Sequence, residues 1–322
     1  MGLGVARRLM FNAAFEAELV DLFGADRVGC RVSLARFTTF RVGGPADWLV
    51  EPKTAGETIA ALRAAHDAGV PVTVIGGGSN VLVGDRGIRG LVLRPRGGSV
   101  GTTDDGAVRA DGAVTLNGLV RWTITHGFDG LAAWAGTPGT VGGAVCGNAH
   151  YGGRLLGDLV ESVLVAGTDG TPCELPPGAM EFGYDRSRLQ RTRELLLWVA
   201  FRLTPGADPA ELRVVARASL AHRKATQPLD AASAGCMFQN PGAGDRVPEG
   251  IPASAGALID RAGLKGRRLG GARVSPVHAN FIVNEGQATA ADIRALADLC
   301  RQTVRERFGV LLREEIVRLG EF

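Results

Sequence analysis

The sequence predicts an α+β protein: a larger unit, a boundary near residue 205 and a smaller α/β unit after it. Three observations lead to this prediction. A strand, a helix and a second strand follow one another between residues 48 and 75. Short apolar runs broken by glycine indicate further strands up to residue 201. Beyond a Pro-Gly linker, a new helix begins with strong start signals at residue 208.

Composition limits the classes of protein to consider. The 322 residues suffice for two ordinary domains, and 45% apolar with 21% charged residues excludes a disordered chain. A net charge of +3 without a basic, aromatic tract argues against a nucleic-acid partner, although it suits an anionic small molecule. The longest apolar run, residues 195–201, is too short to span a bilayer, so we expect no membrane insertion.

The cysteines indicate a reduced compartment. They are five in number, and none shows a CxxC or Cys/His spacing, so we expect neither a disulfide framework nor a metal site. No long apolar segment follows Arg7 and Arg8, which argues against a secretory signal. A cytoplasmic chain fits these features. The oligomeric state stays open, with a monomer favoured.

Local signals place the elements of the first part. Residues 1–30 are predicted to form a helical leader that packs on the body. The elements that follow from periodicity are a helix around 13–23, a strand at 48–50, a helix closed by Gly69 and a strand at 71–75. Thr54 and Glu57 predict a capping box at the start of the second helix.

Further signals place the remaining elements. The middle of the chain is predicted to hold strands at 81–83, 91–93 and 107–110, a helix over 116–126 and a buried strand ending at Phe201. Asp208 and Pro209 open the next helix as N-cap and first helical residue. The last elements are a strand at 281–283, a helix opened by Thr289 and Asp292 and closed by Gly309, and a strand at 316–319.

A glycine-rich loop follows the strand at 71–75. The run Gly76-Gly77-Gly78 fails the dinucleotide fingerprint, because its third glycine would fall at Val81 and no helix is predicted there. It also lacks the GK[ST] of a P-loop. What remains is bare backbone flanked by Ser79 and Asn80, whose successive N–H groups can form an anion-binding nest. A tight turn that requires positive φ is the alternative.

A second glycine-dense stretch, residues 135–144, offers the same chemistry. Two such loops in one domain indicate a single extended ligand held by backbone, as a dinucleotide would be. A third glycine-containing run, residues 38–46, is explained equally well by a turn before an edge strand.

Seven runs together carry a family resemblance. In chain order they are TTFRVGGPAD (38–47), VIGGGSNVLV (74–83), AGTPGTVGGAV (135–145), FGYDRS (182–187), SAGCMFQNP (233–241), HANFIVN (278–284) and EEIVRLG (314–320). The chain thereby resembles UDP-N-acetylenolpyruvoylglucosamine reductase, the MurB family, over nearly its whole length after residue 30. It is similar to the shorter, type II variant without an inserted substrate-capping loop.

The resemblance implies a fold and an activity. It implies an FAD-binding domain of the vanillyl-alcohol-oxidase (PCMH) type, made of two α+β subdomains, over 31–205 and a substrate domain over 206–322. It also implies noncovalent FAD, NADPH as hydride source and a UDP-sugar as substrate. The enolpyruvyl ether of UDP-N-acetylglucosamine enolpyruvate would be reduced to UDP-N-acetylmuramate, a step in peptidoglycan precursor synthesis that serves the cell wall, cell shape and division.

The two glycine loops then become the expected cofactor contacts. The residues concerned are Gly76, Gly77, Gly78, Ser79, Asn80, Gly136, Thr137, Gly139, Thr140, Gly142 and Gly143.

The resemblance also implies a proton donor and an acid. Cys236 stands where similar proteins carry a serine or cysteine donor, and a thiol with an ordinary pKa of about 8.5 is mostly protonated near neutrality. A buried core cysteine is the alternative. Glu315 corresponds to a glutamate that assists charge stabilisation or proton delivery, whereas we expect its neighbour Glu314 to be a solvated acid.

The sequence departs from the family pattern at two places. The usual Tyr-Arg-x-Ser is Tyr184-Asp185-Arg186-Ser187 here, so the arginine expected to bind the substrate carboxylate is displaced by one position. We expect Arg186 to take this role, with Arg188 as the fallback. The segment around His150 is one residue shorter than usual and has histidine in place of glycine. A structural partner is expected for His150, and also for His278.

Five residues are candidates for substrate binding: Tyr184, Arg223, Gln239, Asn240 and Lys265. Core packing is the alternative for Tyr184, and a solvated loop face is the alternative for Lys265.

Two other functions remain open at this point. Another flavoprotein of the same superfamily, such as an oxidase, leaves the runs at 233–241 and 314–320 unused, and covalent flavin would favour it. A non-enzymatic nucleotide-binding protein is kept open by the displaced arginine.

Overall fold

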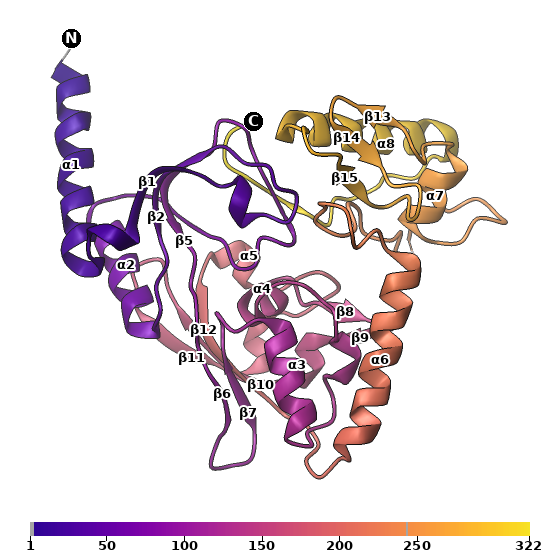
Figure 1. The fold of residues 1–322 in the computed structure, drawn as a ribbon, viewed down its shortest axis with the longest axis horizontal. Coiled ribbons are helices and arrows are strands. Elements are labelled where there is room, and N and C mark those ends of the chain that lie inside the picture. The colour runs from indigo at the N-terminus through magenta and orange to yellow at the C-terminus, as the bar shows by residue number, and fades with distance from the viewer. Residues whose placement is uncertain (1–2, 243) are drawn as a thin grey trace. The chain divides into compact units, whose positions relative to one another are not determined.

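The computed structural model describes residues 3–242 and 244–322 (Figure 1). The chain folds into two compact units. The first comprises Met1–Val32, Ala46–Gly76 and Arg89–Arg217, and the second comprises Ser33–Pro45, Gly77–Ile88 and Ala218–Phe322. Both mix helices and strands, in agreement with the predicted α+β class.

The limits of the units differ from the predicted domain boundaries. Residues 33–45 and 77–88 belong with the C-terminal part, and the division near the predicted boundary at 205 falls inside helix α6 (Pro209–Thr226). The cause is long-range pairing: β4 (Val81–Val83) lies parallel to β16 (Val317–Leu319). The predicted leader packs on the body as expected, because Phe15 and Leu19 are buried in the core of the first unit.

The first unit contains a four-stranded sheet with the order β1-β2-β5-β3. Its strands are β1 (Val28–Ser33), β2 (Pro45–Val50), β3 (Val72–Val74) and β5 (Ile88–Leu93). Helix α1 (Leu3–Phe23) packs against α2 (Ala55–Asp67), and the Phe15 ring meets the edge of Trp48 at 5.0 Å. Phe15, Leu19 and Trp48 are buried in the core of this part.

Helix α2 begins with only half of the predicted capping box. The Thr54 side chain accepts a hydrogen bond from the Glu57 N–H at 3.1 Å, as expected. The Glu57 carboxylate, however, accepts from the Lys53 N–H and binds the Arg27 guanidinium instead of returning to Thr54. The bond to Arg27, followed by that to the Lys53 N–H, lowers the pKa of Glu57 to about 2. The helix ends before Gly69, whose φ is 63°.

The second sheet of the first unit has five strands in the order β11-β10-β12-β7-β6. They are β6 (Val100–Thr102), β7 (Val108–Asp111), β10 (Val160–Ala166), β11 (Pro172–Leu175) and β12 (Leu195–Phe201). The remaining elements are α3 (Leu116–Thr125), α4 (Val141–Cys146), β8 (His150–Tyr151), β9 (Arg154–Leu155) and α5 (Leu189–Thr192). Leu116, Trp134 and Phe201 are fully buried in this core.

The second unit has a three-stranded antiparallel sheet with the order β13-β14-β15. Its elements are α7 (Ala255–Arg261), β13 (Arg268–Leu269), β14 (Ala272–Val274), β15 (Ile282–Asn284) and α8 (Ala290–Phe308). The predicted start and end of α8 are confirmed: Thr289 and Asp292 form a capping box, and Gly309 closes the helix with φ 70°.

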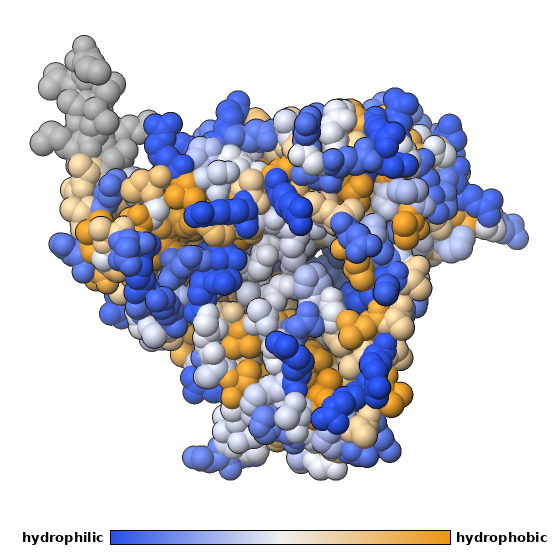
Figure 2. All heavy atoms as spheres, viewed as in Figure 1, coloured by the Kyte–Doolittle hydropathy of each residue, from blue (hydrophilic) through white to orange (hydrophobic). Residues whose placement is uncertain are grey.

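The face drawn in Figure 2 carries both hydrophilic and hydrophobic residues. Figure 2 shows hydrophilic residues spread over the visible face. Within residues 3–242 and 244–322, no helix is long and apolar enough to cross a membrane.

Candidate functional site

The first glycine loop joins β3 to β4. A Cβ atom on Gly76 would overlap the Thr140 hydroxyl, so the close approach of these two residues requires glycine. Thr140 belongs to the second glycine stretch. Gly76 at the start of the first loop and Thr140 of the second stretch are therefore neighbours within the first unit, whereas residues 77–80 of the loop belong to the second unit.

Backbone donors of this loop suit an anion. Among the described residues, no protein acceptor binds the N–H groups of Gly76, Gly77 or Gly78. The Gly78 carbonyl accepts hydrogen bonds from the Thr39 N–H at 3.0 Å and the Thr39 hydroxyl at 3.2 Å, which fixes this part of the loop. Gly78 has φ 65°, and a Cβ atom there would overlap the Phe37 carbonyl. Successive N–H groups left for a ligand are the kind of donors with which a backbone nest binds a phosphate.

The second glycine stretch is more ordered than the sequence suggested, because α4 opens at Val141. The Gly136 N–H donates to Asn117 at 2.7 Å, the Gly142 N–H donates to the Gly112 carbonyl at 2.8 Å, and the Gly143 N–H donates to Thr140. These three donors are therefore engaged by the protein. Of the predicted contacts here, Gly139 and Thr140 keep N–H groups to which no described residue is bonded.

Asn117 is a residue that sequence reasoning missed. Its carboxamide binds two adjacent residues of the stretch, accepting from the Gly136 N–H and donating to the Thr137 carbonyl at 3.2 Å. A lone asparagine at the start of an amphipathic helix gives no signal of this role.

In the second unit, Cys236 and Glu315 lie in hydrogen-bonded neighbouring segments. The Glu315 N–H donates to the Met237 carbonyl at 2.9 Å, and the Gln239 N–H donates to the Arg313 carbonyl at 2.9 Å. The Asn80 side chain donates to the Glu315 carbonyl at 3.3 Å. The fold thus brings Cys236, Glu315 and the last residue of the first glycine loop into one region.

The burial of Cys236 and Glu314 decides between the alternatives that the sequence left open for each. Cys236 is only partly buried, whereas Cys300 is 1% exposed in the core, so Cys236 is not the core cysteine considered above. The expectation of a solvated Glu314 is wrong. Its side chain is 17% exposed and binds Arg301 and Arg318, because the fold places two guanidinium groups beside it.

Asn280 is a second residue that the sequence did not single out, although it lies in the HANFIVN run. Its side chain accepts from the Phe238 N–H at 3.0 Å and donates to the Phe238 carbonyl at 2.7 Å, which fixes the segment after Cys236. His278 has the expected structural partner: its Nδ1 accepts from the Asn280 N–H at 3.3 Å. Burial lowers the pKa of His278.

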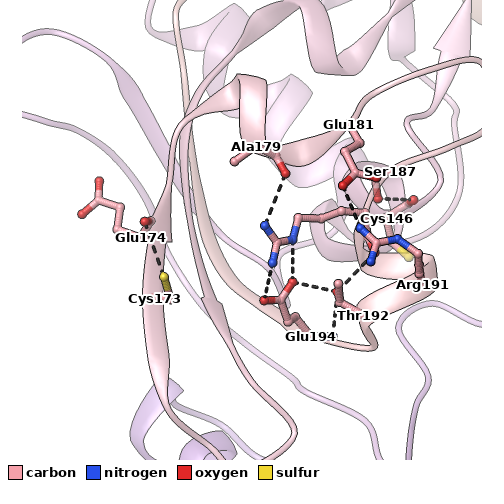
Figure 3. Close-up of polar contacts among 10 residues, drawn as sticks. Cys146, Cys173, Glu174, Ala179, Glu181, Ser187, Arg191, Thr192 and Glu194 are labelled. Carbon is pink, nitrogen blue, oxygen red and sulfur yellow. Dashed lines mark hydrogen bonds and ion pairs between the residues drawn. The ribbon is translucent and has the colours of Figure 1, made fainter.

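Arg186 and Arg188 differ in their contacts. Arg188 binds both oxygens of Glu194, at 2.9 and 3.0 Å, and the Ala179 carbonyl at 3.4 Å. Figure 3 shows Glu194 and Ala179, which accept these hydrogen bonds. Arg186 lies at the end of a tight turn and exchanges two backbone hydrogen bonds with Gly183. Because Arg188 is engaged by a partly buried carboxylate, the geometry favours Arg186 as the arginine that meets a ligand.

Tyr184 and His150 lie beside this turn. Tyr184 is 45% exposed, which excludes core packing. Its ring centroid lies 4.7 Å from that of His150, and His150 Nδ1 lies 3.0 Å from Asp185 Oδ1. His150 therefore has the structural partner that the sequence led us to expect.

The other substrate-binding candidates lie in the second unit. Lys265 pairs with Asp260 at 2.9 Å, and the Asn240 side chain accepts from the Ala255 N–H at the start of α7. Arg223 on α6 is 8% exposed, so it does not belong to a solvated face. Within the described ranges, no group of three His, Cys, Asp or Glu side chains could hold a metal ion.

Comparisons with known proteins agree with this geometry. Residues 46–175 match the FAD binding domain family, and residues 227–319 match the UDP-N-acetylenolpyruvoylglucosamine reductase C-terminal domain family. A reductase of that name from Parasynechococcus marenigrum is 43% identical over 90% of this chain and 95% of its own length. A second, from Symbiobacterium thermophilum, is 43% identical over 88% of this chain and 89% of its own length.

One solved structure is similar over nearly the whole chain. It is the UDP-N-acetylenolpyruvylglucosamine reductase from Thermus caldophilus, with a TM-score of 0.76 and 33% identity, covering 91% of this chain and 99% of that chain. The predicted fold class, an FAD-binding α+β domain followed by a smaller C-terminal domain, is confirmed.

Proposed function

The chain belongs to the UDP-N-acetylenolpyruvoylglucosamine reductase family, and from this premise we propose that it reduces UDP-N-acetylglucosamine enolpyruvate to UDP-N-acetylmuramate. FAD is the cofactor and NADPH the hydride source. One observation carries the proposal: the similarity extends over both the FAD-binding part and the C-terminal domain and covers 95% of a full relative. The product makes the reaction a step of cytoplasmic peptidoglycan precursor synthesis.

The residues present fit FAD. The N–H groups of Gly76, Gly77 and Gly78 are available for a diphosphate, and the absent side chains at Gly76 and Gly78 leave the backbone accessible. Gly139 and Thr140 add donors from the neighbouring stretch. When bound, FAD supplies transfer of a hydride from NADPH to the β-carbon of the enolpyruvyl group.

Cys236 supplies the proton in this proposal. Addition of hydride to the β-carbon leaves negative charge on the α-carbon and its carboxylate. The Cys236 S–H bond breaks as the new C–H bond forms at the α-carbon, and the thiolate recovers a proton from water. Glu315, in the neighbouring segment, assists by stabilising charge during this transfer.

Arg186 binds the substrate carboxylate in this proposal. A guanidinium can hold two carboxylate oxygens at once and so stabilises the charge that develops there. Tyr184, Gln239 and Arg223 contribute further substrate contacts. Asn240 and Lys265 keep this role in the proposal as well, although each already has a protein partner.

An anaerobic half-reaction tests the proposal. The flavin is reduced with NADPH, UDP-N-acetylglucosamine enolpyruvate is added, and we expect the oxidised flavin spectrum to return. Cys236→Ala should still be reduced by NADPH but should not be reoxidised by the substrate. Cys173→Ala, which changes an exposed cysteine, is the control and should behave as wild type.

Two results would contradict it. A wild-type flavin that stays reduced after substrate is added would refute the activity. Normal reoxidation of Cys236→Ala would refute the role of the thiol alone.

A further inference from the structure

A histidine, His150, contacts the corner of the turn that carries Arg186. Gly183 and Arg186 exchange two hydrogen bonds, at 2.9 and 3.1 Å, so Tyr184 and Asp185 form the corner of the turn. Asp185 has φ 52°, a left-handed conformation that costs free energy for a residue with a side chain. The turn therefore depends on contacts that stabilise its corner.

His150 makes contact with both corner residues. Its Nδ1 lies 3.0 Å from Asp185 Oδ1, and its ring lies 4.7 Å from the Tyr184 ring. The Asp185 side chain is only 11% exposed. Among the described residues, His150 is the one side-chain partner of that carboxylate, whose second oxygen is buried without a hydrogen bond. A carboxylate so placed is costly unless it is paired.

The backbone of the turn is fixed by the same loop. Asn148, which is fully buried, donates from its side chain to the Gly183 carbonyl at 2.7 Å and accepts from the Gly157 N–H at 2.7 Å. The Gln190 side chain donates to the Asp185 carbonyl at 3.0 Å. With the backbone held by these bonds, His150 adds contacts to the side chains of both corner residues.

The position of the Arg186 guanidinium depends on this turn. Its Nε and Nη2 atoms would lie 3.3 Å from a Cβ atom on Gly183, so the side chain folds over the start of the turn. A change in the corner shifts Gly183 and Arg186 together, because the two residues are bonded to each other.

We propose that His150 and Asp185 act as one positioning unit, which holds the Tyr184-Asp185-Arg186 turn so that Arg186 meets the substrate carboxylate. This inference rests on the proposed function of Arg186. The two residues lie at the two places where the sequence departs from the family pattern, and their contact explains why the displaced arginine can keep its role.

The test compares His150→Gln, Asp185→Asn and the double variant in the anaerobic half-reactions. Reduction of the flavin by NADPH should stay within about twofold of wild type. Reoxidation by saturating UDP-N-acetylglucosamine enolpyruvate should slow about tenfold or more in each single variant, since a small displacement of a positioning group has effects of this size. The double variant should be no slower than the slower single one, because the residues act together.

Two variants keep the test decisive. Asp185→Gly removes the carboxylate but relieves the backbone strain at φ 52°, so it folds readily and should still be slow. Glu181→Gln breaks the ion pair of Glu181 with Arg191, whose side chains are 53% and 68% exposed, and should react as wild type.

The outcomes separate this inference from the proposed function. Wild-type reoxidation rates in the single variants, losses that multiply in the double variant, or a fast Asp185→Gly would overturn the positioning unit. If Arg186→Ala is slow in the same experiment, the proposed function stands even then. An inert wild-type chain would overturn the proposed function and this inference together.

Discussion

Arg186 and Arg188 show how two neighbouring arginines can have different roles. Both carry the same fork of donors, and the sequence offers no reason beyond register to prefer one. The two oxygens of Glu194, whose side chain is 16% exposed, accept hydrogen bonds from Nε and Nη2 of Arg188. Arg186 folds over a turn beside the exposed Tyr184. The ion pair with Glu194 therefore identifies Arg188 as the structural arginine and leaves Arg186 as the candidate for substrate binding.

This contrast predicts opposite effects of two substitutions. Arg188→Ala leaves Glu194 partly buried without its guanidinium partner, so we expect the free energy of unfolding to fall by about 1–3 kcal/mol. The folded fraction should still reoxidise its flavin with substrate. Arg186→Ala should unfold as wild type but lose nearly all substrate-driven reoxidation. Denaturant titration and the half-reaction check both variants. An inactive Arg188→Ala of normal stability would show that the register is wrong.

At the scale of elements, the backbone of the first glycine loop follows a path that only residues without side chains allow. Gly76 passes against the Thr140 hydroxyl, and this contact joins two segments that lie far apart in the sequence. Sequence reasoning found both segments because glycine clusters are rare. It read the second segment as a loop, however, and missed α4 because Gly142 and Gly143 have low helix propensity.

Substitution of Gly76 tests the loop. In Gly76→Ala the new methyl group overlaps Thr140, so the loop must shift. Its N–H groups then move away from the positions in which they would bind FAD. We expect purified Gly76→Ala to retain much less FAD than wild type, measured as flavin absorbance per chain. Gly101→Ala on β6 is the matched control, since a Cβ atom there meets nothing within 4 Å. Equal flavin content in the two variants would argue against a role of this loop in cofactor binding.

The start of α2 predicts a dependence of stability on pH. The bond to Arg27 lowers the pKa of Glu57 from 4.5 to about 2. A carboxylate with a lowered pKa in the folded state stabilises it above its unfolded pKa, and this contribution is lost as the pH falls through the folded value. The Glu57–Arg27 pair should therefore contribute fully above pH 4.5 and disappear towards pH 2.

Melting temperatures of wild type and Glu57→Gln, measured between pH 7 and pH 2, check this prediction. The gap between them should be widest near neutrality and should close as the pH falls. Glu161→Gln is the control, because its partner Arg202 is 77% exposed and such surface pairs contribute little. A gap that stays constant down to pH 2 would contradict the lowered pKa of Glu57.

At the scale of the whole molecule, the chain is not divided where its linker suggests. The Pro205-Gly206 linker and the start of α6 were located correctly, yet the two compact units interleave along the sequence. Residues 77–88 join the second unit because β4 pairs with β16 and because the Asp85 carboxylate accepts hydrogen bonds from the Ala290 and Ala291 N–H groups. No local pattern in the sequence predicts the pairing of β4 with β16 or the bonds of Asp85 to the start of α8.

The two family matches can be located on the two compact units. The C-terminal match, residues 227–319, lies within the second unit, and the FAD-binding match, residues 46–175, lies in the first unit except for residues 77–88. The fold class and the reductase family were predictable from seven short runs, since each run combines residue types that backbone approach and acid–base chemistry require.

The sequence by itself determined the features whose causes lie within a few residues. The capping box and closing glycine of α8, the apolar strand β12 and the glycine loops belong here, because helix caps, strand periodicity and glycine conformations act over short stretches of chain. Only the tertiary structure decided which partner each charged group takes. Glu57 binds Arg27 from 30 positions away, Asp185 binds His150 from 35, and Asp85 caps α8 from 205. A carboxylate binds whichever donor the fold brings within about 3 Å, and that distance is set by the packing of the whole chain.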